Sequence, residues 1–209
     1  MEKIIICNLK SNLLNNDINN YINKIKNNNF IILPSNIYIK DFIKENINVG
    51  IQDISPYENG SYTSFISANQ ASSVGVKYIL LNHVEIKKMT NQTITDLKNK
   101  IKLSQKYNLK IILCIENIIE LKEIIKDIDL KDIIFVLEPG YTIGNVALTI
   151  NEIKENIINI KKIIKENKVL YGGSVNKSNI KNILSITEVD GVLLGKASLD
   201  IENIIKEVN

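Results

Sequence analysis

Features that direct a protein to a membrane or out of the cell are scarce in this sequence of 209 residues. No stretch approaches the ~20 consecutive apolar residues that a membrane-spanning helix needs. The first apolar run is short and is ended by Asn8 and Lys10, unlike the hydrophobic segment of a secretion signal. The two cysteines, Cys7 and Cys114, both lie in apolar runs and give no disulfide framework. We therefore expect a cytoplasmic protein without a membrane partner.

The sequence also has little excess charge of either sign. Charged residues make up 23% and hydrophobic residues 44%, and the formal net charge is +3. This positive excess is too small to argue for a nucleic-acid partner. The length suits one domain with a substantial core, and no linker-like stretch divides the chain. We expect residues 1–209 to form a single domain.

Eight short runs rich in Ile, Val and Leu alternate with longer segments of helical spacing. The runs are residues 3–8, 30–34, 48–52, 77–82, 109–114, 133–138, 169–172 and 191–195. The helical segments are residues 16–28, 36–46, 67–74, 90–106, 117–128, 147–167, 176–185 and 199–207. Nearly continuous apolar strands are typical of a parallel sheet buried on both faces. Eight β-then-α units favour a closed (βα)8 TIM barrel over an open doubly wound sheet, although ~250 residues are typical of such barrels.

Polar residues follow several of these strands. In (βα)8 barrels the chemistry takes place at the carboxyl ends of the strands, where the βα loops meet. Lys10 follows the first strand, His83 the fourth and Glu138 the sixth. The second and fifth strands, which end at Pro34 and Cys114, offer less. We expect the lysine, the only histidine and the carboxylate to share one face of the barrel.

Glu138 is unusual in its setting, FVLEPGYTIGN. Burying an unpaired carboxylate is costly, so a core strand has no use for one. A surface turn would not need the four apolar residues that precede it. This position indicates a purpose beyond folding.

Glycine-containing turns follow the last two strands. Gly172, Gly173 and Ser174 precede a predicted helix, and Gly195 and Lys196 precede the next. A helix N-terminus binds anions through its free N–H groups and its dipole. The pair of turns predicts a phosphate site, with purely structural turns as the alternative.

Five motifs of the sequence resemble those of triosephosphate isomerases, in that family's order and on the strands where it has them. They are residues 8–10, 82–85, 138–144, 171–175 and 190–199. Residues 52–53 and 59–63 also resemble the family's long third loop. The resemblance extends from residue 6 to residue 199, with gaps between the motifs.

This resemblance implies the interconversion of dihydroxyacetone phosphate and D-glyceraldehyde 3-phosphate, in glycolysis and gluconeogenesis, without a metal or an organic cofactor. It implies that Glu138 is the base and that His83, as a neutral imidazole, polarises the carbonyl. Lys10 would supply positive charge to the substrate, with Asn8 as a second polar contact. Glu85 would be a buried carboxylate that pairs with Lys10.

The resemblance also implies a phosphate site and a lid. The backbone N–H groups of four residues would hold the phosphate: Gly144, Ser174, Gly195 and Lys196. Residues 139–145 would form a lid over it.

The sequence departs from the family pattern at several positions. Gly140 and Tyr141 stand where a β-branched residue and a tryptophan are usual. Lys196 replaces a glycine, and the far end of the lid is about two residues shorter than usual. These departures bear on turnover more than on reaction type.

The third loop predicts a homodimer. Residues 53–65 are largely polar, yet they include three aromatic residues, Tyr57, Tyr62 and Phe65. If the loop faced solvent, these aromatic side chains would have no packing partner. The resemblance implies that this loop reaches a second subunit and brings Thr63 near its active site.

Two other functions stay open at this point. The first is another phosphate-binding barrel enzyme, such as a sugar-phosphate epimerase or a thiamine-phosphate or indole-glycerol-phosphate synthase. The second is a non-catalytic barrel that binds a phosphorylated ligand.

Overall fold

Eight parallel strands close into a barrel in the order in which they occur along the chain. The computed structural model describes residues 2–142 and 147–208. The strands are β1 (Ile4–Asn8), β2 (Ile31–Leu33), β3 (Asn48–Ile51), β4 (Tyr78–Leu81), β5 (Lys110–Ile115), β6 (Ile133–Leu137), β7 (Val169–Tyr171) and β8 (Gly191–Leu194). The predicted single-domain (βα)8 TIM barrel is confirmed.

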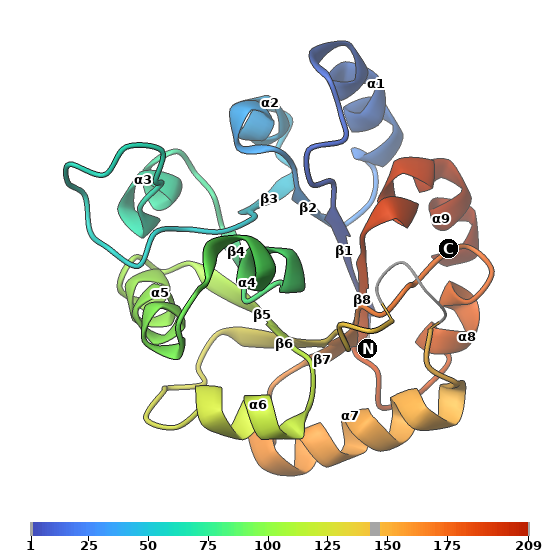
Figure 1. The fold of residues 1–209 in the computed structure, drawn as a ribbon. Coiled ribbons are helices and arrows are strands. Elements are labelled where there is room, and N and C mark those ends of the chain that lie inside the picture. The colour runs from blue at the N-terminus through green and yellow to red at the C-terminus, as the bar shows by residue number, and fades with distance from the viewer. Residues whose placement is uncertain (1, 143–146, 209) are drawn as a thin grey trace.

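Helices surround the strands on the outside of the barrel (Figure 1). They are α1 (Asn15–Ile25), α2 (Ile39–Lys44), α3 (Ala68–Ser73), α4 (Val84–Thr90), α5 (Ile94–Lys106), α6 (Ile118–Ile124), α7 (Ile150–Ile164), α8 (Ile180–Leu184) and α9 (Ile201–Val208). Short 3-10 helices cover Asn36–Tyr38 and Lys196–Asp200. Within the two described ranges, no helix is both long and apolar enough to span a bilayer.

The apolar residues form two layers, because successive side chains of a strand point to opposite faces. On β5, Ile112 and Cys114 belong to the cluster inside the barrel, while Ile111 and Leu113 belong to the layer beneath the helices. Helix α7 shows why its sequence folds as a helix. Its sequence has five isoleucines at three- and four-residue intervals. The first, Ile150, is 40% exposed, and the other four are buried: Ile153, Ile157, Ile160 and Ile164. Each fully buried isoleucine contributes about 1.5–3 kcal/mol.

The predicted helix over residues 90–106 is wrong at its start. An unpredicted helix, α4 (Val84–Thr90), precedes it. Asn91, with a φ of 51°, ends α4 and separates it from the next helix. Asparagine adopts this left-handed conformation more readily than most residues. Helix α5 then begins at Ile94, after a capping box between Thr93 and Asp96.

The turn after β7 also differs from expectation. Helix α8 begins at Ile180 and not at residue 176. Asn176 accepts hydrogen bonds from the backbone N–H and the hydroxyl of Ser178, and Asn179 accepts from the backbone N–H of Asn176. Such side-chain bonds compete with helix formation. Ser174 therefore lies in a loop, and no helix N-terminus directly follows the glycines of this turn.

Candidate active site

The three predicted catalytic side chains, far apart in sequence, line one pocket of about 630 Å³. They are Lys10, His83 and Glu138, from the carboxyl ends of β1, β4 and β6. The turns after β7 and β8 complete the wall with Gly172, Ser174, Gly195 and Lys196. The closed barrel produces this convergence, because all its parallel strands end at one rim.

Hydrogen bonds hold both the backbone and the side-chain ammonium group of Lys10. Its φ is 51°, which a non-glycine residue seldom adopts. Its backbone N–H donates to Asn8 Oδ1 at 3.1 Å, and its carbonyl accepts from Gln52 Nε2 at 2.9 Å. Its ammonium group donates to Glu85 Oε1 at 2.5 Å. These contacts hold the positive charge over the pocket.

His83 precedes the first turn of α4 and is buried. Its Nδ1 accepts the backbone N–H of Glu85 at 3.3 Å. A nitrogen that accepts cannot carry a proton, so the neutral ring has its proton on Nε2. Nε2 lies 3.5 Å from Glu138 Oε2. The missed helix α4 thus determines which histidine nitrogen can act as a donor in the pocket.

Glu138 follows the last residue of β6 and is 4% exposed. Its backbone N–H donates to the Ile115 carbonyl at 2.8 Å. Its Oε2 has no hydrogen-bond partner among the described residues. A buried carboxylate oxygen without a partner costs free energy, and such strain is typical of a functional group.

Cys114, on β5, adjoins the Glu138 carboxylate. Burial raises the pKa of its thiol well above the usual range, and the charge and hydrogen bond of Glu138 raise this pKa further. Cys114 therefore stays protonated and adds no negative charge beside Glu138. Cys7 is likewise buried, and burial raises its pKa to about 12. Neither thiol has the lowered pKa of a reactive cysteine.

The predicted phosphate residues of the described ranges line the same pocket, and a β-carbon at Gly195 would lie 3.9 Å from Lys10 Nζ. Ser174 has a φ of 52° and donates its hydroxyl to the Thr142 carbonyl. A β-carbon at Gly173 would come within 2.6 Å of Thr142 Oγ1, so only glycine allows the two loops to approach this closely. Gly195 and Lys196 begin the 3-10 helix after β8. Gly144 lies outside the described residues.

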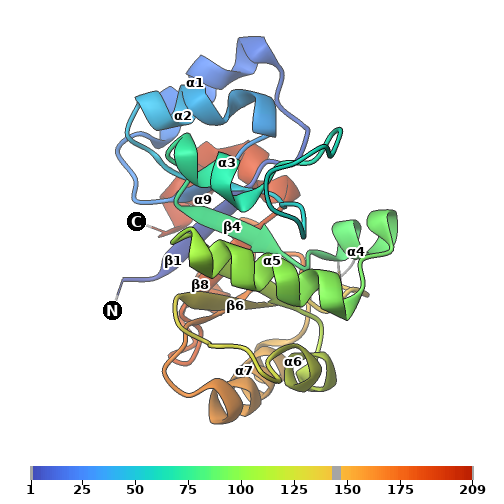
Figure 2. The same cartoon turned by 90° about the vertical axis from the view of Figure 1, so that its left-hand side faces the viewer.

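Two predicted residues stand apart from the pocket lining. Asn8 is buried, and its Oδ1 is engaged with the Lys10 backbone. Thr63 is exposed on the loop between β3 and α3, which projects from the barrel (Figure 2). Glu85 does pair with Lys10, but its side chain is 41% exposed, so the prediction of a buried carboxylate is wrong. The pocket mouth leaves it open to solvent.

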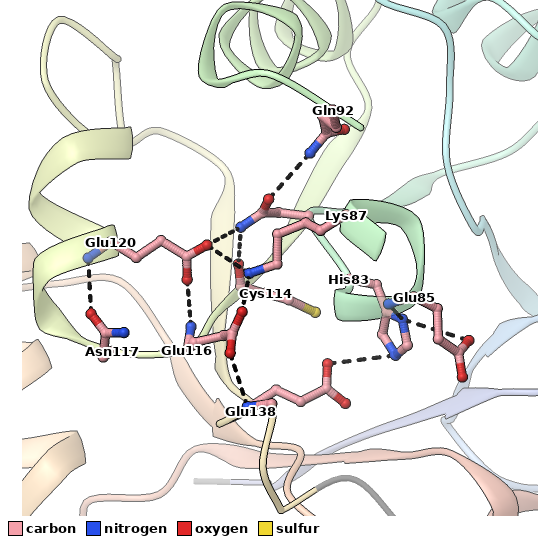
Figure 3. Close-up of polar contacts among 11 residues, drawn as sticks. His83, Glu85, Lys87, Gln92, Cys114, Glu116, Asn117, Glu120 and Glu138 are labelled. Carbon is pink, nitrogen blue, oxygen red and sulfur yellow. Dashed lines mark hydrogen bonds and ion pairs between the residues drawn. The ribbon is translucent and has the colours of Figure 1, made fainter. Parts of the chain in front are cut away.

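An ionic cluster beside Glu138 was not predicted from the sequence. Lys87 donates to Glu116 Oε1 at 2.5 Å and to Glu120 Oε1 at 2.7 Å. Figure 3 shows Glu116 between Lys87 and the chain that carries Glu138. Two signals were available: Lys87 lies one helical turn after His83, and Glu116 follows the apolar run of β5.

The fold and the pocket together define a class of protein, a (βα)8-barrel enzyme with an ammonium, an imidazole and a carboxylate at its mouth. Within the described ranges, no group of three or more His, Cys, Asp or Glu residues could hold a metal ion.

Comparison with known proteins identifies the family. A family model described as triosephosphate isomerase matches residues 3–209. The triosephosphate isomerase of Mesomycoplasma hyopneumoniae strain 7448 is 32% identical over 233 residues, covering 97% of this chain and 96% of the relative. That of Wigglesworthia glossinidia brevipalpis is 34% identical, covering 87% and 84%. That of Campylobacter hominis is 31% identical, covering 92% and 88%.

The chain belongs to the triosephosphate isomerase family. It is an isomerase that interconverts dihydroxyacetone phosphate and glyceraldehyde 3-phosphate, a step of glycolysis. Membership in this family decides against the other phosphate-binding barrels and against a non-catalytic barrel.

Proposed function

We propose that Glu138 is the base of this isomerisation, that His83 is the electrophile, and that Lys10 stabilises the negative charge of the intermediate. The observation that supports these roles best is the distance of 3.5 Å between His83 Nε2 and Glu138 Oε2, in the pocket that Lys10 also lines. A substrate of three carbons inserted here would meet all three groups at once.

The chemistry begins with the carboxylate. Glu138 Oε2, which has no competing hydrogen bond among the described residues, removes a proton from the carbon next to the carbonyl. The electron pair moves onto the carbonyl oxygen, and His83 Nε2–H donates to this oxygen. The Lys10 ammonium stabilises the resulting enediolate, because fixed donors are strongest where charge develops. His83 then moves a proton between the two oxygens: Nε2–H protonates the former carbonyl oxygen, and Nε2 takes the proton of the neighbouring hydroxyl. Glu138 delivers its proton to the carbon that had carried the carbonyl. The former hydroxyl oxygen becomes the new carbonyl, so the product is an isomer of the substrate.

The substrate phosphate would bind at the turns after β7 and β8, which line the same pocket. We assign it to the N–H groups of Ser174, Gly195 and Lys196, together with Gly144, which lies outside the described residues. The Lys196 side chain is exposed and lines the pocket, so it adds positive charge at the rim. Asn8 would then act on the substrate indirectly, through the backbone of Lys10.

Deuterium exchange tests this mechanism. In D₂O, the carboxyl proton of Glu138 can exchange with solvent before it returns, so we expect deuterium on the carbon next to the carbonyl in the product. NMR of the products made from dihydroxyacetone phosphate would measure it. Turnover with no deuterium in the product, under conditions where the free product does not exchange, would favour a hydride shift and contradict the proposed base.

We also propose that the chain is a homodimer in the cytoplasm. Its support is a cluster of aromatic side chains on the projecting loop. The Tyr57 and Tyr62 rings stack at 4.7 Å between centroids, and Phe65 meets Tyr57 edge-on at 6.5 Å. All three are exposed, and grouped exposed apolar side chains are typical of interaction sites. Thr63, between them, would reach the active site of the second subunit.

Phe65→Asp is expected to convert the dimer to a monomer and to lower activity, because it places a charge in the apolar contact. Light scattering would measure the mass. Ile119→Asp is the matched control, since Ile119 is 81% exposed on α6, and α5 lies between α6 and the projecting loop (Figure 1). A wild-type protein that is monomeric and fully active at low concentration would contradict the dimer.

A further inference from the structure

The Glu116 carboxylate joins two parts of the molecule. Its Oε2 accepts the backbone N–H of Gly140 at 3.1 Å. Its Oε1 accepts from the Lys87 ammonium at 2.5 Å, and Lys87 also bonds Glu120. Gly140 lies two residues after Glu138. Glu116 therefore connects the backbone beside the proposed base to a fixed positive charge on α4.

The end of β5 holds this backbone at two points. The Ile115 carbonyl accepts the Glu138 N–H at 2.8 Å, and the Glu116 side chain accepts the Gly140 N–H. The residue between them, Pro139, has no N–H. The two backbone N–H groups between Glu138 and Gly140 are thus both bound at the end of β5, by the consecutive residues Ile115 and Glu116.

The contact with Glu116 also accounts for the glycine at position 140. A β-carbon there would lie 2.5 Å from Glu116 Oε2, a distance that non-bonded atoms do not tolerate. The Glu116 carboxylate would have to shift to make room, and this shift would weaken its hydrogen bond to the Gly140 N–H. Gly140 is not at a positive φ, so its backbone conformation would allow an alanine. The glycine that departs from the family pattern is explained by the glutamate opposite it.

The charge of Glu116 is secured by its neighbours. Burial by itself would raise the pKa of Glu116, but the hydrogen bond and charge of Lys87 and the Gly140 N–H outweigh it, and the pKa lies below its usual value. Glu116 is therefore an ionised acceptor at neutral pH. Charge-assisted hydrogen bonds of this kind are stronger than neutral ones.

We propose that Glu116 is a positioning residue for the isomerisation: it fixes residues 138–140 and so aims the Glu138 carboxylate at the substrate. This inference depends on the proposed role of Glu138. Glu138 Oε2 has no hydrogen bond among the described residues, so the backbone that carries Glu138, together with the Cys114 thiol beside the carboxylate, sets its position. Catalysis is sensitive to such positions, since a shift of ~1 Å can cost about a hundredfold in rate.

The first test compares variants of Glu116. Glu116→Ala is expected to lower kcat about tenfold or more, with a smaller change in KM and in inhibition by inorganic phosphate, because three of the four proposed phosphate-binding residues follow β7 and β8. Glu116→Gln keeps an acceptor for Gly140 and should recover most of kcat. Glu116→Asp keeps the charge but is too short to reach both Lys87 and Gly140, so it should lose kcat as alanine does. Glu123→Ala, an exposed glutamate on α6, is the control.

The second test is a double-mutant cycle with Gly140→Ala. In the wild-type background this change should lower kcat about as much as Glu116→Ala, since the new methyl group displaces the carboxylate. In the Glu116→Ala background it should add little, because the contact is already lost. Additive effects, or an unchanged kcat in both Glu116→Ala and Glu116→Asp, would overturn the proposal.

These results can be separated from a failure of the proposed mechanism. If Glu138→Ala abolishes activity while the Glu116 variants do not change it, the base is correct and the positioning role is wrong. If Glu138→Ala leaves activity unchanged, the proposed mechanism itself fails. Thermal melting of each variant would show that the loss of kcat is not a loss of folded protein.

Discussion

Replacing Glu138 with alanine is expected to lower kcat by about three orders of magnitude, within the range that a general base contributes. The reason is the loss of the carboxylate that takes the proton, since no other carboxylate lies within 3.5 Å of His83 Nε2 among the described residues. A coupled assay of glyceraldehyde 3-phosphate formation would measure the loss. Activity that survives the substitution unchanged would end the proposed mechanism.

Glu138→Gln separates chemistry from packing in this test. Glutamine has nearly the same volume as glutamate but cannot accept the proton, so we expect a comparable loss of kcat. Because Glu138 Oε2 is buried without a hydrogen bond, removing its charge removes a desolvation cost. The melting temperature of Glu138→Gln should therefore not fall below that of the wild type. A fall would mean that the carboxylate serves the fold.

Replacing Lys10 with methionine should lower kcat/KM about a hundredfold to a thousandfold, the range found for the loss of one preorganised donor to an oxyanion. Methionine keeps the length of the side chain and removes its charge. The remaining partner, Glu85, is 41% exposed and can be solvated, so the fold should survive. Steady-state kinetics, with circular dichroism as a check on folding, would measure the effect.

Lys196→Met provides the comparison for Lys10. It removes the same charge, but from an exposed side chain at the rim of the pocket. We expect it to raise KM a few-fold with kcat nearly unchanged, and this effect should shrink in high salt, since exposed charges are screened. Lys10 is 26% exposed and tied to Glu85, so its loss should be large at any salt concentration. Equal effects of the two substitutions would contradict a specific role for Lys10.

The elements that the sequence predicted best are those with strong local signals. Five isoleucines of α7 recur at helical intervals, and four of the five are buried, while Ile150 at the start of the helix is exposed. All eight strands were found because each lies in a short run rich in Ile, Val and Leu. The start of α8 was misplaced because the Asn176 and Asn179 side chains accept backbone N–H groups of nearby residues, those of Ser178 and Asn176. The spacing of apolar residues does not show this local competition.

The sequence predicted the residues of the site that lie at strand ends, but not the residues whose role depends on the direction of a side chain. Residues at strand ends are brought together by the barrel itself, so Lys10, His83 and Glu138 could be named from their positions along the chain. Glu116 could not, because its significance depends on where its side chain points. The same holds for the burial of Glu85, which depends on how open the pocket mouth is.

The sequence by itself determined the closed barrel and the three groups at its mouth, since alternating apolar runs specify the strands and parallel strands end at one rim. Only the tertiary structure decided that His83 has its proton on Nε2, through the backbone N–H of Glu85, and that Gly140 faces Glu116. Both depend on distances of a few ångströms between residues of different elements, and no local pattern of residues encodes these distances.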